Sequence, residues 1–184
     1  EMPGMYTEGE YDLAGFAVGA VERDQILDAS NVQSGDVLLG LASSGLHSNG
    51  YSLARRALLE ASGLELGSAL AGTEGSLGDA LLEPTRIYVR PVRAALQSHR
   101  GAIHALAHIT GGGLVDNLPR VLPEGLEAEL NWGSWPEPAI YGPLRACGIV
   151  EAELRRTFNL GIGMVVIVAA QDAAAVASTL EASG

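Results

Sequence analysis

Apolar residues along the chain fall into short runs that are separated by polar, glycine-containing turns. Runs of this length between turn residues are typical of strands in a packed sheet. The clearest strands are expected at residues 37–42, 103–109 and 161–170. Residues 37–42 are apolar on both faces, which predicts a central position in the sheet. Residues 161–170 form the most apolar run, and Gly161 and Gly163 leave room there for a neighbouring backbone.

Apolar residues that recur every three or four positions predict helices between these strands. Residues 51–61 place Leu53, Ala57 and Leu58 on one face and charged residues mostly off it. Pro91 suits the first position of a helix that runs to about residue 99. Further helical segments are expected at residues 79–83, 114–121, 140–147, 150–155 and 172–182.

Three segments have a less regular pattern and are expected to be strands or extended pieces: residues 12–22, 86–89 and 126–131. The first carries Phe16, Val18 and Val21 among small residues, and the last alternates apolar and polar positions. Loops are expected at residues 28–36 and 63–78. Strands and helices alternate unevenly, which predicts a layered α+β domain with a mixed sheet rather than a doubly wound sheet.

Composition excludes several classes of function. The 184 residues suit one domain, and the formal net charge of −11 argues against a nucleic-acid surface, which needs clustered Lys and Arg. Every basic residue is Arg, so the chain lacks the Lys of a Walker-type phosphate loop and of a Schiff-base enzyme. The longest apolar run is too short to span a bilayer, and no signal peptide is visible. A lone cysteine, Cys147, forms no internal disulfide and fits an intracellular setting.

A polar turn between the strand at 37–42 and the helix at 51–61 is the first candidate site. Its polar and glycine residues include Ser44, Gly45, His47, Ser48 and Asn49. Serine and asparagine are good N-cap residues, and the free N–H groups at a helix start attract anions such as phosphate. The histidine adds a group that titrates near neutral pH. The alternative is an ordinary capped turn without a ligand.

A second candidate site follows the strand at 103–109. Thr110, Gly111, Gly112 and Gly113 lead into the next predicted helix, so their backbone could approach an anion closely. Two such turns in one small domain favour a phosphorylated ligand. His104 and His108 share one face of the strand by their spacing. Because no third ligand is near in sequence, we expect two polar residues on a half-exposed face rather than a metal site.

Five motifs then occur in an order that resembles a known enzyme family. They are MPGMY (residues 2–6), YDLAGF (11–16), SSGLHSNGYS (43–52), ITGGG (109–113) and RTFNLGIGM (156–164). In this order they resemble the C-terminal half of phosphoribosylformylglycinamidine cyclo-ligase, also called aminoimidazole ribonucleotide synthetase. The resemblance covers nearly the whole chain.

The resemblance implies an ATP-dependent cyclo-ligase of purine biosynthesis. That enzyme closes the imidazole ring of aminoimidazole ribonucleotide from formylglycinamidine ribonucleotide. It implies a three-layer α/β/α domain at residues 12–184, preceded by an interdomain segment at residues 1–11. The N-terminal halves, absent here, would pair into a homodimer and supply much of the ATP and Mg²⁺ site. A cytoplasmic protein without nucleic-acid or membrane partners is expected, and this chain alone is expected to lack catalysis.

Carried over onto this chain, the resemblance also implies site residues. His47 is expected to donate to the activated oxygen or its phosphate, or to move a proton during ring closure. Substrate or phosphate contacts are expected at Ser44, Gly45, Ser48, Asn49, Thr110, Gly111, Gly112 and Gly113. Further cleft candidates are Glu1, Tyr6, Asp12 and Asn159. The last two have an alternative role, in which they only fix neighbouring strands.

Two other interpretations stay open. The chain could be a non-catalytic module that binds a phosphorylated metabolite or a partner protein, with its glycine turns kept for structure. It could also belong to another member of the same ATP-using superfamily, such as selenophosphate synthetase or thiamine-monophosphate kinase, and serve a different substrate.

Overall fold

The computed structural model describes residues 9, 11 and 13–184. Within these residues one sheet contains β1 (Val37–Ala42), β2 (Ile103–His108) and β3 (Ile162–Val168), in the order β1-β3-β2. β3 pairs antiparallel with both neighbours, so Val168 lies opposite Val37 on one side and opposite Ile103 on the other. The strands predicted at 37–42, 103–109 and 161–170 are therefore confirmed.

β3 is the central strand because it pairs with β1 on one side and with β2 on the other, and its side chains are apolar on both faces. Val165 and Ile167 pack into the core on one face, and Val166 and Val168 pack into the core on the other. The central position expected for residues 37–42 is wrong, because β1 lies at the edge of the described sheet. Apolar side chains on both faces of a strand indicate that both faces are covered. They do not indicate whether both edges of the strand are paired with other strands.

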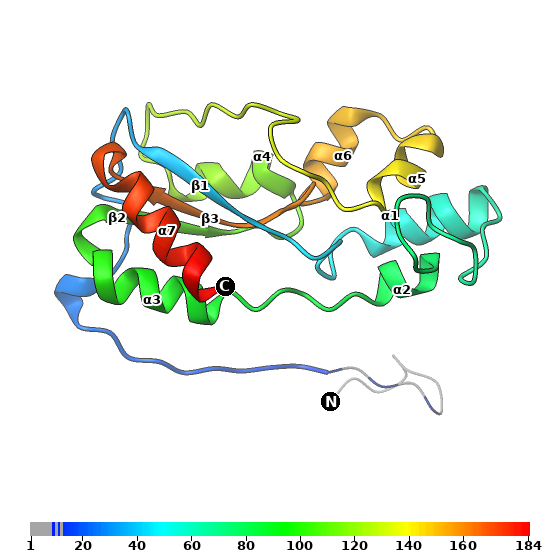
Figure 1. The fold of residues 1–184 in the computed structure, drawn as a ribbon, viewed down its shortest axis with the longest axis horizontal. Helices are drawn as coiled ribbons and strands as arrows, with labels where there is room; N and C mark the ends of the chain where they lie inside the picture. The colour runs from blue at the N-terminus through cyan, green and yellow to red at the C-terminus, as the bar shows by residue number, and fades with distance from the viewer. Residues whose placement is uncertain (1–8, 10, 12) are drawn as a thin grey trace.

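Helices α3 (Val89–His99) and α7 (Ala173–Ser183) cover one face of the sheet. Ala95 of α3 and Val176 of α7 are fully buried and share a cluster with Val166. Figure 1 shows α7 crossing in front of the strands, with α3 beside it. The two helices thus form a layer of their own.

Helix α4 (Gly113–Asn117) and the 3₁₀ turn after it, η4 (Leu118–Val121), cover the opposite face. Leu114 and Leu118 are buried there, next to Ala107 of β2. The arrangement is helix, sheet, helix (Figure 1). The α+β class with helices on both faces is confirmed, and both strand pairs are antiparallel where a mixed sheet was expected.

A third cluster lies beyond the end of the sheet. Its helical elements are α1 (Tyr51–Arg55), the π-helical turn η2 (Arg56–Ala61), α2 (Leu77–Leu82), α5 (Tyr141–Ala146) and α6 (Glu151–Thr157). Their fully buried side chains include Leu58, Tyr141 and Leu154. Leu46 belongs to the same cluster, so the turn after β1 is anchored in this part of the core. The remaining 3₁₀ turns are η1 (Arg23–Gln25), η3 (Arg100–Ala102) and η5 (Ala170–Asp172).

The predicted helices are confirmed with small shifts at their ends. The helix expected at 51–61 is continuous, but its second half is a π-helix. The turn expected at 79–83 begins earlier, at a capping box in which Ser76 and Asp79 bind each other's backbone N–H groups. α3 begins at Val89, two residues before Pro91.

The strand predicted at 12–22 is wrong for its described part. Residues 13–22 form no strand, and Phe16 is 94% exposed, as Val18 and Val21 also largely are. Figure 1 shows this segment running outside the helices, away from the sheet. The described sheet consists of β1, β3 and β2, and this segment is not one of its strands.

Two further segments predicted as strands or extended pieces form no strand. Residues 86–88 are irregular, and α3 begins at the next residue. Residues 126–131 alternate half-buried and exposed side chains, as predicted, but they form no ladder. Leu126 and Leu130 pack against the α4 face of the core instead. The apolar side of this segment therefore covers a face of the sheet.

The described helices are all too short or too polar to cross a membrane. The interdomain segment predicted at residues 1–11 lies almost entirely outside the described residues.

A hydrogen bond between the side chains of Asp36 and His104 connects the turn before β1 to β2. Asp36 Oδ2 accepts a hydrogen bond from His104 Nδ1 at 2.7 Å and another from the Gln33 N–H at 3.0 Å. Asp36→Ala leaves His104 buried without this partner, so we expect the free energy of unfolding in urea to fall by about 1–3 kcal/mol. The exposed Asp24→Ala is the control, with an expected change within about 0.5 kcal/mol. Equal effects of the two variants would contradict this role.

Candidate functional site

The turn at residues 43–50 has an unusual backbone conformation. His47 and Ser48 have φ values of 54° and 58°, in a region that few residues other than glycine adopt. Leu46, directly before them, is buried in the third cluster. The buried leucine and the hydrogen bonds described next hold the turn in this shape.

His47 lies beneath the turn and is only 3% exposed. Its Nε2 is 3.0 Å from the backbone N of Ser44 and 3.2 Å from the backbone N of Arg86. The hydroxyl of Ser44 is 2.9 Å from the same nitrogen. Burial, followed by electrostatic repulsion from His108 and Arg86, lowers the pKa of His47. The neutral imidazole is thus the favoured form.

Asn159 connects the start of β3 to this turn and is 1% exposed. Its Oδ1 accepts hydrogen bonds from the Ser43 hydroxyl at 2.8 Å, the Gly161 N–H at 2.8 Å and the Tyr141 hydroxyl at 3.1 Å. Its Nδ2 donates to the Gly45 carbonyl at 2.8 Å. Of the two roles expected for Asn159, these contacts favour fixing neighbouring segments over reaching a cleft.

Asn49 joins the first turn to the loop at 110–113. Its Oδ1 accepts from the Gly111 N–H at 2.9 Å, and its Nδ2 donates to the His47 carbonyl at 2.7 Å. Within the second loop, Asn117 Nδ2 lies within 3.3 Å of the carbonyls of Thr110, Gly111 and Gly113. The structure therefore brings the two candidate turns together.

Packing explains two of the three consecutive glycines. A Cβ on Gly113 would overlap the carbonyl oxygens of Arg155 and Phe158, so the loop can approach α6 only with glycine there. A Cβ on Gly112 would lie 2.8 Å from that of Asp116. Gly111 is exposed, and the nearest atom to a Cβ there is Asn49 Oδ1 at 3.9 Å. Gly111 is the member of the three that a ligand could approach.

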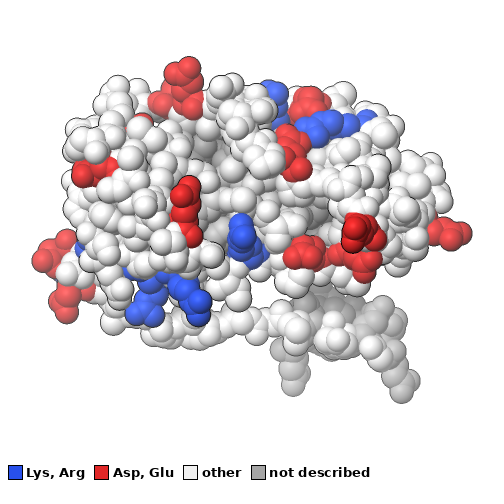
Figure 2. Space-filling model, in the orientation of Figure 1, with Lys and Arg blue, Asp and Glu red and all other residues white. Residues whose placement is uncertain are grey.

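Several polar groups around the joined turns reach solvent. Ser48, Gly111 and His108 are exposed, and Asn49 and Thr110 are half-buried. Figure 2 shows the arginines on one face of the molecule in separate groups among acidic residues. That face offers local positive charge rather than a continuous basic surface.

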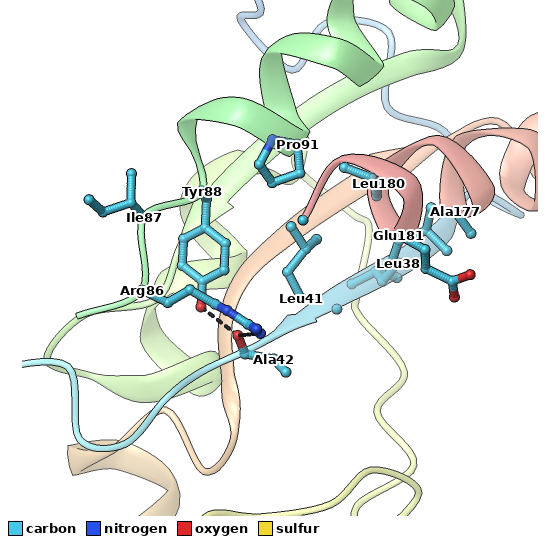
Figure 3. Close-up of a pocket in the computed structure, with 13 residues that line it drawn as sticks. Leu38, Leu41, Ala42, Arg86, Ile87, Tyr88, Pro91, Ala177, Leu180 and Glu181 are labelled. Atoms are coloured by element: carbon cyan, nitrogen blue, oxygen red, sulfur yellow. Dashed lines mark hydrogen bonds between the residues drawn. The ribbon is translucent and has the colours of Figure 1, made fainter. Parts of the chain in front are cut away.

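A cavity of about 540 Å³ lies on one side of the turn, along β1 and between α3 and α7. Its lining includes Leu38, Leu41, Arg86, Tyr88, Pro91 and Leu180. Figure 3 shows Arg86 and Tyr88 both directed at the Ala42 carbonyl, to which they donate at 3.2 Å and 2.8 Å. Burial raises the pKa of Tyr88 to about 12, so its hydroxyl keeps its proton.

Sequence reasoning missed Arg86 and Tyr88. The available signal was an arginine and a tyrosine in an otherwise apolar piece that follows Pro84. A smaller cavity of about 230 Å³ lies on the other side of the turn, where Ser44 and Gly45 meet α2. The first residues of the turn thus separate two cavities.

The remaining predicted residues divide into two groups. Glu1, Tyr6 and Asp12 lie outside the described residues. His104 and His108 do not share a half-exposed face, because His104 is buried against Asp36 while His108 is exposed. Among the described residues, no group of three or more His, Cys, Asp or Glu side chains is placed to hold a metal ion.

Comparison with known proteins gives a consistent result. A family model described as "AIR synthase related protein, C-terminal domain" matches residues 33–184. A protein of Sorangium cellulosum (strain So ce56), named phosphoribosylformylglycinamidine cyclo-ligase, is 57% identical over 169 residues, which are 91% of this chain and 49% of that protein. A protein of Burkholderia multivorans (strain ATCC 17616 / 249) with the same name is 56% identical over all of this chain and 51% of its own length. The chain spans about half the length of the curated relatives it matches.

Removal of the Asn159 side chain tests its role in holding the turn. Asn159→Ala leaves the Gly45 carbonyl and three donors without their shared partner. We expect the free energy of unfolding to fall by about 2–4 kcal/mol. Asn131→Ala, at an exposed position, is the control and should stay within about 0.5 kcal/mol of the parent chain. A small loss for Asn159→Ala in urea unfolding would mean that the turn is held by other contacts.

A second substitution tests the close approach of β3 to His47. A Cβ on Gly163 would lie 2.7 Å from Cε1 and 2.8 Å from Nδ1 of His47, and would overlap the Tyr88 hydroxyl. We expect Gly163→Ala to lower the free energy of unfolding by about 1–3 kcal/mol, because the ring or the strand must shift. Gly142→Ala in α5, whose Cβ would meet no atom within 4 Å, should be neutral or stabilising. Thermal unfolding of both variants distinguishes this contact from a general effect of alanine.

Proposed function

Because the chain belongs to the family described as AIR synthase related protein, C-terminal domain, we propose that it forms the substrate-side half of an ATP-dependent cyclo-ligase. In the proposed reaction, ATP phosphorylates the formyl amide oxygen of formylglycinamidine ribonucleotide. The amidine nitrogen attacks the activated carbon, and phosphate leaves as the imidazole ring of aminoimidazole ribonucleotide closes. The shared name of the relatives supports this reaction, and their length supports a longer active chain.

The hydrogen bond between Asn49 and Gly111 is the observation that carries the proposal. It joins two turns that are 62 positions apart in sequence, each of which precedes a helix. Backbone N–H groups before helices, together with an exposed serine hydroxyl, suit a phosphorylated ligand. We assign substrate or phosphate contacts to Ser44, Gly45, Ser48 and Asn49 on the first turn and to residues 110–113 on the second.

His47 lies at the centre of this proposed site. Its contacts link the Ser44 end of the turn to the segment that carries Arg86. The site is open on the side of Ser48 and Gly111, where a second domain could close over a substrate. In this proposal the chain binds and orients the ribonucleotide, and the preceding half of the enzyme delivers the activating phosphoryl group.

ATP and Mg²⁺ belong to the preceding half in this proposal. Magnesium prefers carboxylate and other oxygen ligands, and the described residues provide no cluster of three acidic or other metal-binding side chains. We therefore assign no magnesium ligand to this chain and derive no step through the metal. We propose that the full-length enzyme is a cytoplasmic homodimer, as the resemblance to the cyclo-ligase family implies.

The segment before the family domain fits a contact with the preceding half. Residues 13–22 precede the start of the family match at residue 33, and Phe16, Val18 and Val21 are exposed. Such apolar side chains in an extended segment are stabilised when they pack against another surface. We assign that surface to the chain's own N-terminal half.

One observation favours a second candidate function. Gly112 and Gly113 are explained by packing alone, as expected for a binding module whose glycine turns serve structure. Such a module would bind a phosphorylated metabolite without converting it. A third candidate is another reaction of the same superfamily, which would appear as turnover of selenide or thiamine phosphate.

Joining this chain to its ATP-binding half tests the proposed function. We expect the joined protein to convert formylglycinamidine ribonucleotide to aminoimidazole ribonucleotide only when ATP is present. Asn49→Ala should lower kcat/KM at least about tenfold, because one hydrogen bond that orients both turns is lost.

Gln171→Ala, at an exposed position in η5, is the matched control and should keep the parental rate. A joined, folded protein that binds the ribonucleotide without converting it would support the binding module instead. Parental activity in Asn49→Ala would contradict the proposal that the hydrogen bond between the two turns orients the substrate.

A further inference from the structure

We propose that His47 is a positioning residue, whose unprotonated Nε2 holds Ser44 and Arg86 in one arrangement, and that it does not transfer a proton itself. This inference deepens the proposed function and rests on it only for what the turn binds. The inference states which ring nitrogen carries the proton, and this decides whether the side chain can exchange a proton with a substrate.

The partners of Nε2 decide its protonation. The backbone N–H groups of Ser44 and Arg86 both point at this nitrogen, at 3.0 Å and 3.2 Å, and a backbone N–H can only donate. A proton on Nε2 would face two donors and leave both without an acceptor. The Ser44 hydroxyl does not need the ring as its acceptor, because it donates to the Pro84 carbonyl at 2.6 Å. Nε2 is therefore the bare nitrogen of a neutral ring.

The ring proton then lies on Nδ1. That atom is buried and has no hydrogen-bond partner among the described residues. It lies against β3 at Gly163, where even a methyl group would come within 2.8 Å of it. A substrate on the surface of the turn thus has access to neither nitrogen, since one is occupied by amides and the other is enclosed.

The groups that face His47 favour the same state. Arg86 adds positive charge, His108 of β2 also faces the ring, and Tyr88 places its ring 6.0 Å away, centroid to centroid. The Tyr88 hydroxyl donates to the Ala42 carbonyl and keeps its proton at physiological pH. Burial and these charges lower the pKa of His47, so the ring stays neutral where an exposed histidine would begin to charge.

The acceptor role has a consequence for both cavities. Arg86 and Tyr88 line the larger cavity and reach the Ala42 carbonyl (Figure 3), while Ser44 lines the smaller one. His47 binds the backbone of a residue from each set. Its Nε2 is a single acceptor shared by Ser44 and Arg86, so it fixes the position of the turn relative to the segment at 84–88.

The tautomer of His47 is the most direct test, measured on the unmodified 184-residue chain by ¹H–¹⁵N correlation of the imidazole nitrogens. His47→Gln, which lacks the ring, assigns its signals among the four histidines. We expect the pattern of a neutral ring with its proton on Nδ1 at pH 8, and a midpoint of charging below that of a free histidine. A proton on Nε2 at pH 8, or a midpoint at or above that of a free histidine, would overturn the inference.

Two substitutions separate an acceptor from a proton carrier. In His47→Gln the side-chain oxygen can occupy the place of Nε2, whereas in His47→Asn the shorter side chain reaches only the place of Nδ1. We expect His47→Asn to raise the equilibrium constant of unfolding at least about tenfold more than His47→Gln does, because in His47→Asn two buried amides lose their acceptor. This order opposes the backbone preference, since asparagine tolerates positive φ better.

The same pair in the joined enzyme gives a functional reading. Retention of most of kcat in His47→Gln, with a large loss in His47→Asn, supports positioning. Equal and large losses of kcat in two stably folded variants would show that the imidazole itself is required, and would overturn the inference. Failure of the proposed function as a whole would leave the tautomer and the stability order unchanged, so the two outcomes are distinguishable.

Discussion

The side-chain amide of Asn159 is the interaction on which the candidate site depends. β1 and β3 run antiparallel, so the end of β1 and the start of β3 lie at the same end of the sheet. The amide joins the two segments there, because it binds Ser43 and Gly45 directly after β1 and Gly161 directly before β3. Asn159 is buried, and a buried polar group without a hydrogen bond is unfavourable. The arrangement that satisfies the whole amide is therefore favoured over others.

The rest of the site follows from that fixed start. Once Ser43 and Gly45 are held, Leu46 enters the core and the chain must turn back through two residues with positive φ. The turn then places His47 under the surface and Asn49 beside the second loop. Backbone strain of this kind persists only where surrounding contacts over-determine it, and it is concentrated at functional sites. The structure therefore offers a rigid base with a few polar groups exposed above it.

The sequence predicted the parts of this arrangement that local pattern controls. The apolar runs indicated the three strands, helical spacing indicated the helix after Gly50, and the glycine and serine content marked both turns. It could not supply the pairing of strands. β1 is as apolar as a central strand yet lies at the edge of the described sheet, and residues 13–22 have a strand-like pattern but are not part of that sheet. Hydrogen bonds over long sequence separations were also hidden. One of them joins His47 to the backbone of Arg86, and this histidine, which was expected to contact the substrate, is buried.

We propose that two linked turns form a substrate-side half-site within this chain. Isothermal titration of the 184-residue chain, first with formylglycinamidine ribonucleotide and then with ATP, tests this proposal. We expect saturable heat of binding for the ribonucleotide and none for ATP, because the ATP site is assigned to the preceding half. Binding of ATP alone, or of neither ligand, would contradict a half-site that is already formed here.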